Sequence, residues 1–301
     1  MKPKFVLIFF INFLLIVSSL LVYTNSLDRK TIVSADTTSD LLDSKSHLKI
    51  WSSDFTESYW RKHWQIIKRG SWGIENYEIK ADPSQKFQQI LRVYYPANSA
   101  SPTVTKKQGN PPGGTQFYAK LNLPPQDSLI LSYYVRFSEN FDFVKGGKLP
   151  GLFGGVGNNG GNIPDGTDGF STRYMWRKRG DGEIYAYLPS SKKNHGTSIG
   201  RGTWRFVPGK WYHLQQKIIL NEPGKHNGSI QVWVDDKKVL EQNGIMFRTT
   251  DTLKIDGILF STFFGGGDPS WATRKNVYAD FADFSVLPGQ KHTQAAKTFT
   301  K

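Results

Sequence analysis

Residues 169–189 read GFSTRYMWRKRGDGEIYAYLP, and this stretch predicts a β-hairpin. Two runs, 170–178 and 183–189, are rich in aromatic and other residues that favour strands, because such side chains fit a pleated and half-buried surface. The segment RGDG at 179–182 separates them, and its two glycines are typical of a short hairpin turn. Polar side chains on one face of this hairpin would therefore form a common surface.

Five polar side chains in and near this hairpin form an unusual chemical set. Lys148 precedes it in GGKLPGLFGG, whose glycines allow the backbone to approach a ligand closely. Alternate residues of a strand share a face, so Ser171 is expected beside Arg173 and Tyr185 beside Tyr187. Two cations, a hydroxyl and two phenols suit the binding of an anionic sugar and the transfer of a proton beside its carboxylate.

The register of the hairpin decides whether the two pairs meet. If Arg177 lies directly opposite Glu183, the two charges pair across the strands. That register also places Arg173 opposite Tyr187 and puts the serine, the arginine and both tyrosines on one face. A slip of one residue would send the tyrosines to the other face. We predict the register in which Arg177 faces Glu183.

Strand-like runs recur along the chain, and turn-rich segments separate them. This spacing favours an all-β fold, a β-jelly-roll sandwich of two antiparallel sheets, over units that alternate strands with helices. The high glycine and aromatic content, 29 glycines and 14% aromatic residues, agrees with many turns and broad sheets. The further predicted strands are 90–95, 116–121, 129–137, 211–220, 229–234 and 255–264.

The lysine of GGKLPG, the Ser-x-Arg pair and the Tyr-x-Tyr pair occur in this order and at nearly this spacing in polysaccharide lyase family 14. The chain resembles that family, which includes alginate lyases and glucuronate lyases of algal viruses, over residues 50–287. GGTQFYAKL around Gln116 and the closing GGGDPSWATRKNVYADFADFSV are part of the resemblance. Family 20 glucuronan lyases share related strand motifs and the jelly-roll fold. The resemblance implies a lyase that cleaves alginate or glucuronan by β-elimination.

Elimination from a uronate requires neutralisation of the carboxylate, a base for the C5 proton and an acid for the leaving oxygen. Arg173 is the candidate for neutralisation, because its planar fork matches a carboxylate, and Lys148 is a second positive contact. Tyr185 and Tyr187 are candidates for base and acid, and nearby cations would lower the pKa of a phenol from about 10. Two residues are expected to bind the sugar by hydrogen bonds: Ser171 and Gln116. These residues require no cofactor and no metal.

Composition restricts the partners. Lysine and arginine total 39 against 25 acidic residues, a formal net charge of +14, which attracts polyanions. Cysteine is absent, which excludes disulfides, thiolate-bound zinc and thiol catalysis. We expect an acidic polysaccharide as the partner, no nucleic acid, and a monomeric protein.

The chain divides into four parts by composition. Two lysines precede an apolar run at 5–23, so 1–25 is predicted to be a signal peptide or a membrane anchor, with the remainder outside the cytoplasm. Residues 26–49 are expected to be a linker, 50–288 the lyase domain and 289–301 a disordered tail.

Two other functions fit parts of the sequence. A glycoside hydrolase needs two carboxylates across the scissile bond, and Glu183, Asp280 and Asp283 form no clear pair. A non-catalytic carbohydrate-binding module would use exposed tryptophans, and the candidates are Trp72, Trp176, Trp204 and Trp271. His195 is an alternative proton carrier whose position the sequence does not determine.

Overall fold

The computed structural model describes residues 49–192 and 195–289 of the chain. The predicted signal peptide or anchor at 1–25, the linker up to residue 48 and the tail from residue 290 lie outside the described residues. Within the described ranges, no helix has both the length and the apolar character needed to span a bilayer. The described residues from Ile50 onward form one compact unit.

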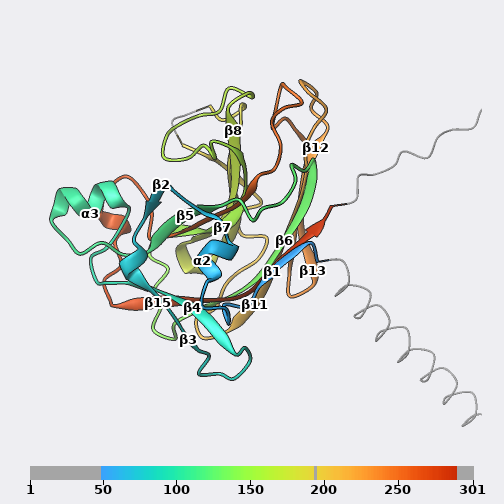
Figure 1. Ribbon diagram of the computed structural model, residues 1–301. Coiled ribbons are helices and arrows are strands. Elements are labelled where there is room, and N and C mark those ends of the chain that lie inside the picture. Colours follow the sequence, from blue (N-terminus) through green and yellow to red (C-terminus); the bar gives the residue numbers. More distant parts are fainter. Residues whose placement is uncertain (1–48, 193–194, 290–301) are drawn as a thin grey trace, which may run out of the picture. The chain divides into compact units, whose positions relative to one another are not determined.

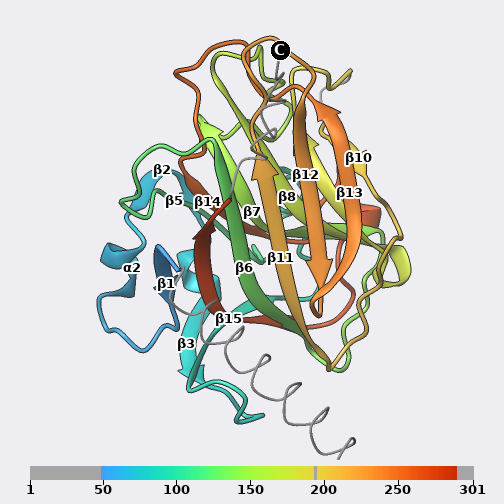
Figure 2. The ribbon, with the colours of Figure 1, turned by 90° about the vertical axis from the view of Figure 1, so that its right-hand side faces the viewer.

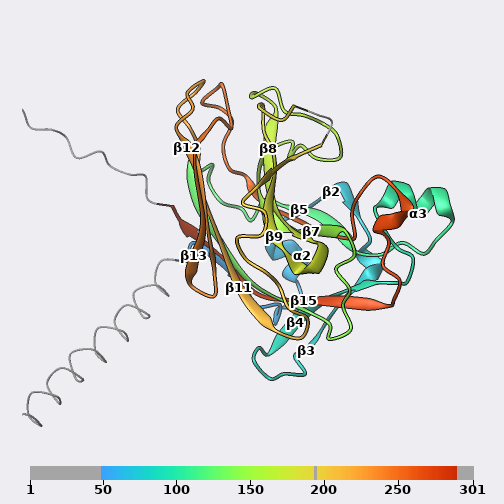
Figure 3. The same ribbon diagram turned by 180° about the vertical axis from the view of Figure 1, so that it is seen from behind.

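Two antiparallel sheets make up this unit, as the sequence predicts for a jelly roll, and Figures 1 and 3 show them as two layers. Figure 2 views the larger sheet, with β15, β6, β11, β12 and β13 side by side. In spatial order its strands are β13 (Lys237–Ile245), β12 (Gly228–Val234), β11 (Trp211–Ile219), β6 (Ser128–Phe137), β15 (Val277–Pro288), β4 (Gln89–Tyr95) and β3 (Tyr77–Ala81), and β1 (Trp51–Ser53) also pairs with β15.

The second sheet carries the predicted hairpin. In spatial order its strands are β10 (Thr197–Ile199), β9 (Gly182–Tyr187), β8 (Gly169–Arg177), β7 (Gly146–Gly155), β14 (Gly257–Thr262), β5 (Thr115–Ala119) and β2 (Ile66–Trp72). Helical segments are short: α2 (Trp60–His63), α3 (Pro102–Gln108), η1 (Ile74–Asn76), η2 (Lys178–Gly180) and η3 (Pro269–Trp271).

Aromatic side chains fill the space between the sheets. Phe117 and Phe260 stack with ring centroids 4.7 Å apart, and Tyr133 stacks on Phe284 at the same separation. Such residues alternate along the strands with polar ones, so one face of each sheet is buried and the other carries polar groups. In β8 the core-facing residues are Phe170, Thr172, Tyr174 and Trp176, which leaves Ser171, Arg173, Met175 and Arg177 on the outer face.

The glycine-rich segment GGKLPGLFGG forms one ten-residue strand, β7, with an irregularity in its pairing at Pro150. Its glycines make room for neighbours within the fold. A Cβ on Gly147 would lie 2.0 Å from the Trp176 ring, and one on Gly151 would lie 2.1 Å from the Thr172 carbonyl oxygen. The small residues therefore allow β7 to pack closely in the sheet, and this fixes Lys148 beside β8.

Candidate active site

The hairpin register differs from the predicted one by two residues. Arg173 pairs with Tyr185 and Ser171 pairs with Tyr187, so the prediction that Arg173 faces Tyr187 and Arg177 faces Glu183 is wrong. A shift by an even number of residues keeps every side chain on its face. The long Arg177 side chain reaches Glu183 diagonally, with Nε 2.7 Å from Oε1, so charge pairing does not require direct opposition.

The register brings the four predicted catalytic residues to one cavity of about 750 Å³ on the outer face of the second sheet. Lys148, Arg173, Tyr185 and Tyr187 line it, and so does Gln116. The Tyr185 and Tyr187 rings meet edge-on with centroids 5.8 Å apart. Lys148 Nζ lies 4.3 Å from the centroid of the Tyr185 ring and 3.2 Å from Met175 Sδ.

Ser171 and Gln116 lie at the base of the site, in supporting positions. Ser171 is fully buried, and its hydroxyl donates a hydrogen bond of 2.5 Å to the Asn158 carbonyl. This contact holds the glycine-rich loop after β7. Ser171 therefore lies beneath the cavity. The Gln116 side chain accepts a hydrogen bond from Ser261 Oγ and donates one to the Gly70 carbonyl.

Ser261 also links this chain of hydrogen bonds to Arg173, because Arg173 Nη1 donates to its hydroxyl at 3.0 Å. Arg173 is only 2% exposed, and its Nε is a buried donor without a partner in the described chain. No carboxylate of the described residues forms an ion pair with it. The guanidinium is therefore a buried cation at the cavity wall, with one donor that has no partner among the described residues.

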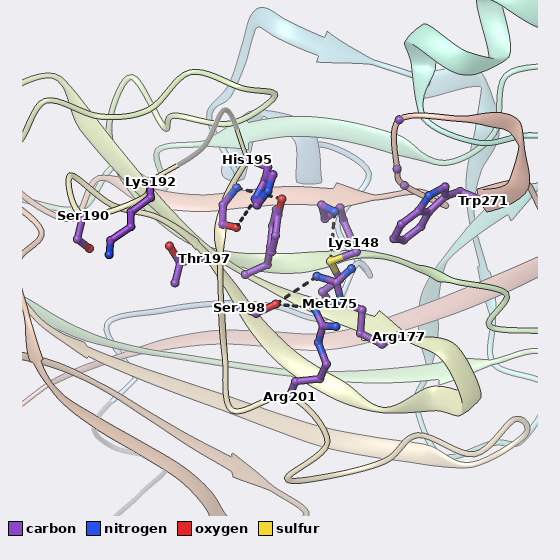
Figure 4. A pocket seen from close by; sticks show the side chains of 15 residues that line it. Lys148, Met175, Arg177, Ser190, Lys192, His195, Thr197, Ser198, Arg201 and Trp271 are labelled. Atoms are coloured by element: carbon purple, nitrogen blue, oxygen red, sulfur yellow. Dashed lines mark hydrogen bonds between the residues drawn. The ribbon is translucent and has the colours of Figure 1, made fainter.

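A second cavity of about 670 Å³ adjoins the first and is shown in Figure 4. The two share Lys148, Tyr185, His195 and the glycine strip Gly265–Gly267, so they form two lobes of one groove. We call the lobe with Arg173 and Tyr187 the tyrosine lobe and the other the arginine lobe. His195 lines both lobes. It therefore lies close enough to the site to be a candidate proton carrier.

The groove is strongly basic. Six cationic side chains line its two lobes, and no aspartate or glutamate among the described residues does. The cations are Lys107, Lys148, Arg173, Arg177, Lys192 and Arg201. This lining favours a ligand that carries negative charge along its length.

Burial and like charges control the protonation of the site. Burial, followed by the charges of Arg173 and Arg177, holds the pKa of Lys148 well below its usual value. Burial raises the pKa of Tyr185 to about 12, and Tyr187 contributes in the same direction, while the hydrogen bond from the Gly196 amide and the charge of Arg173 oppose the rise. The expectation that nearby cations lower the phenol pKa is therefore wrong for Tyr185, because desolvation of the phenolate outweighs the cations.

The other constellations have structural roles. Glu183 is fully buried and bonded to Arg177, Arg201 and Ser198, and Asp280 is buried between Arg92 and Arg136 in the other sheet. Neither carboxylate lines the groove, so the described residues place no acid pair there for hydrolysis. Within the described ranges, no group of three or more His, Cys, Asp or Glu residues could hold a metal.

Several residues had no role assigned from the sequence: Met175, Lys107 and Arg201 line the groove, and Ser261 holds Arg173. Of the four tryptophans considered for sugar stacking, Trp72 and Trp271 line the groove, while Trp176 and Trp204 are buried in the core. The alternation of β8 would have identified Met175. The other missed residues come from distant segments, which only the fold brings to the groove.

Known proteins share this architecture. The polysaccharide lyase 14 family model matches residues 83–284. The crystal structure of a marine PL-14 alginate lyase from Aplysia kurodai is 30% identical, with a TM-score of 0.67 over 80% of this chain and 99% of that one. An alginate lyase from a Chlorella virus is 23% identical, with a TM-score of 0.67 over 80% of this chain and 100% of that one.

An endo-β-1,4-glucuronan lyase from the fungus Trichoderma reesei is similar in fold, at 12% identity and a TM-score of 0.53 over 80% of this chain and 96% of that one. No curated protein sequence matches the chain. The family model covers two thirds of the residues, including the whole hairpin and the segment that carries Lys148. This chain belongs to the polysaccharide lyase 14 family.

Proposed function

We propose that this polysaccharide lyase cleaves a polyuronate, alginate or glucuronan, by β-elimination at the junction of the two lobes. The observation that carries the proposal is the groove itself, where the described residues place six cationic side chains, Arg173 among them, beside two phenols and no carboxylate. A uronate polymer supplies one carboxylate per sugar and thus complements such a lining. The names of the similar enzymes, two alginate lyases and a glucuronan lyase, support this substrate class.

Arg173 neutralises the carboxylate of the sugar that reacts. Arg173 lines the cavity and Ser261 holds its Nη1, so the planar guanidinium is oriented to meet the carboxylate. As the C5–H bond breaks, negative charge moves onto the carboxylate, and a buried cation stabilises that charge more strongly than it would in water. The C4–O bond then breaks, a C4=C5 double bond forms, and no water is consumed.

Tyr185 is the acid in this scheme. With a pKa of about 12 it keeps its proton at neutral pH and can donate it to the departing C4 oxygen. Tyr187, whose ring centroid lies 5.9 Å from the Arg173 guanidinium carbon, is the proposed base for the C5 proton. Lys148 is the competing base, because its lowered pKa increases the fraction of neutral amine.

Gln116 and Ser171 hold these groups in place. Gln116 orients Ser261, which in turn holds Arg173, and Ser171 fixes the loop whose Gly161 amide donates to the Tyr187 hydroxyl at 3.3 Å. We further propose that the enzyme acts as a monomer outside the cytoplasm. The N-terminal apolar segment directs its export, either as a signal peptide that is removed or as a membrane anchor that is retained.

The test is a substrate panel. Purified residues 36–301 are incubated with mannuronate-rich and guluronate-rich alginate, glucuronan and pectate, and the absorbance of unsaturated uronate near 235 nm is followed. We expect product from alginate or glucuronan, with masses that show no added water, and none from the Tyr187→Phe variant. Products that carry an added water, or full activity in that variant, would contradict the proposal.

A further inference from the structure

The arginine lobe contains a charge cluster that the elimination scheme does not use. Glu183 lies at its centre and is fully buried. Arg177 Nε donates to Glu183 Oε1 at 2.7 Å, while Arg201 Nε and Ser198 Oγ donate to Oε2 at 2.6 and 2.9 Å. A single carboxylate therefore orients two guanidinium groups, and Figure 4 shows Arg177 and Arg201 approaching Ser198 from two sides.

The cluster has a net positive charge, because two arginines share one glutamate. The Glu183 oxygens already accept bonds from three side chains, whereas Arg201 has donors to spare. Its side chain is 54% exposed, and its Nη1 has no hydrogen-bond partner among the described residues. A planar donor that is held in place by Glu183 and open to the groove is ready to bind a carboxylate.

Local sequence places Arg201 at this position. It lies between Gly200 and Gly202, which both have left-handed backbone conformations, with φ of 67° and 80°. The turn directs the chain out of β10 and lets Arg201 return towards Glu183. The Trp271 ring centroid lies 6.0 Å from the Arg177 guanidinium carbon, and the ring provides an apolar wall in the same lobe. A sugar unit offers both an apolar face and a charge to such a surface.

We propose that the Arg177–Glu183–Arg201 cluster is a second carboxylate-binding site, which holds another uronate of the same polymer in the arginine lobe. This inference rests on the proposed function. Arg201 contacts the carboxylate, and Glu183 is a positioning residue. The polymer then crosses Lys148 and Tyr185 with bound uronates on both sides, an arrangement that favours cleavage within the chain rather than at its end.

The experiment compares Arg201→Ala with a matched control, Arg205→Ala. Both residues are exposed arginines, 54% and 58%, each paired with one acidic side chain, but Arg205 lies outside the groove beside Asp181. On long polyuronate we expect Arg201→Ala to raise KM by about three- to tenfold, as for a solvent-accessible charge-assisted contact, with kcat within about twofold. Arg205→Ala should match the wild type, and Arg201→Lys should fall between the wild type and Arg201→Ala.

Substrate length gives a second measurement. The KM ratio of Arg201→Ala to wild type should shrink on shorter oligomers, because those bound at the tyrosine lobe no longer reach Arg201. Equal KM values for Arg201→Ala and Arg205→Ala on long polymer, or a ratio independent of length, would overturn the second site while wild-type activity still supports the proposed function. A wild type that is inactive on every polyuronate would instead refute the proposed function.

Discussion

The guanidinium carbon of Arg173 lies 5.9 Å from the ring centroid of Tyr187, while the Arg173 backbone pairs with that of Tyr185. One buried cation thus lies within reach of both phenols of the site. A buried charge without a counter-ion costs folding free energy, and here no described carboxylate compensates it. An arriving carboxylate supplies the missing partner, so the unpaired state of Arg173 is explained by binding rather than by stability.

Arg173→Lys should test how much the planar guanidinium group contributes to catalysis. The variant keeps the charge but loses the planar pair of donors, so we expect kcat/KM on polyuronate to fall by about a hundredfold, the size found for loss of a group that stabilises developing negative charge. The measurement is the initial rate near 235 nm. The melting temperature and the far-UV spectrum serve as controls for folding. A loss of less than about threefold would show that charge alone suffices.

The pH dependence of activity should report the raised pKa of Tyr185. Since the pKa of Tyr185 is raised to about 12, its proton is retained throughout the ordinary alkaline range. We therefore expect Tyr185→Phe to be inactive, and no descending limb in the wild-type kcat/KM profile from this residue below about pH 11. Initial rates from pH 6 to 11 in buffers of constant ionic strength would measure this. A descending limb near pH 10, the value of an ordinary phenol, would contradict the assignment of Tyr185 as the acid.

Alternation along the hairpin was enough to predict which side chains share a face. The fixed period of two along a strand keeps Ser171, Arg173, Tyr185 and Tyr187 on one side, whatever even shift occurs. Register was not predictable from the Arg177–Glu183 charge pair, because a long arginine side chain reaches a diagonal partner as easily as a direct one.

The surroundings of the site were harder to predict from the sequence than the residues that form it. Lys148 reaches Tyr185 only because β7 pairs with β8, and Arg201 reaches Glu183 only through the turn after β10. Such contacts depend on sheet order, which local patterns do not specify. The pKa of Tyr185 likewise depends on burial, which outweighs the cations that are visible in the sequence.

The glycines of β7 should be required for packing. A Cβ on Gly147 would lie 2.0 Å from Trp176 Cζ2 and 2.5 Å from the Phe263 carbonyl oxygen, so Gly147→Ala should destabilise the domain by about 1–3 kcal/mol, as overpacking does. Chemical denaturation measures the change. Gly267→Ala is the control, since no atom lies within 4 Å of an added Cβ there. Equal stability of the two variants would show that β7 shifts freely.

Lys148 is expected to reduce stability while it serves the reaction. It is 8% exposed, and burial together with Arg173 and Arg177 lowers its pKa, so the folded protein loses this proton at a lower pH than the unfolded chain does. Between the native pKa and the unfolded value of about 10.4, the unfolded state binds more protons, and stability rises with pH. At neutral pH the native protein therefore carries a penalty that is relieved only in alkali.

Lys148→Met removes this penalty and keeps the length of the side chain. We expect the variant to lose activity, yet to melt at least about 2 °C above the wild type at pH 7, which corresponds to about 1 kcal/mol in a domain of this size. The difference should shrink as the pH approaches 10. Lys107→Met, at an exposed lysine on α3 that lines the same groove, should leave the melting temperature unchanged, because no desolvation is relieved there. A Lys148→Met variant that melts below the wild type at pH 7 would mean that contacts of the ammonium group outweigh its burial.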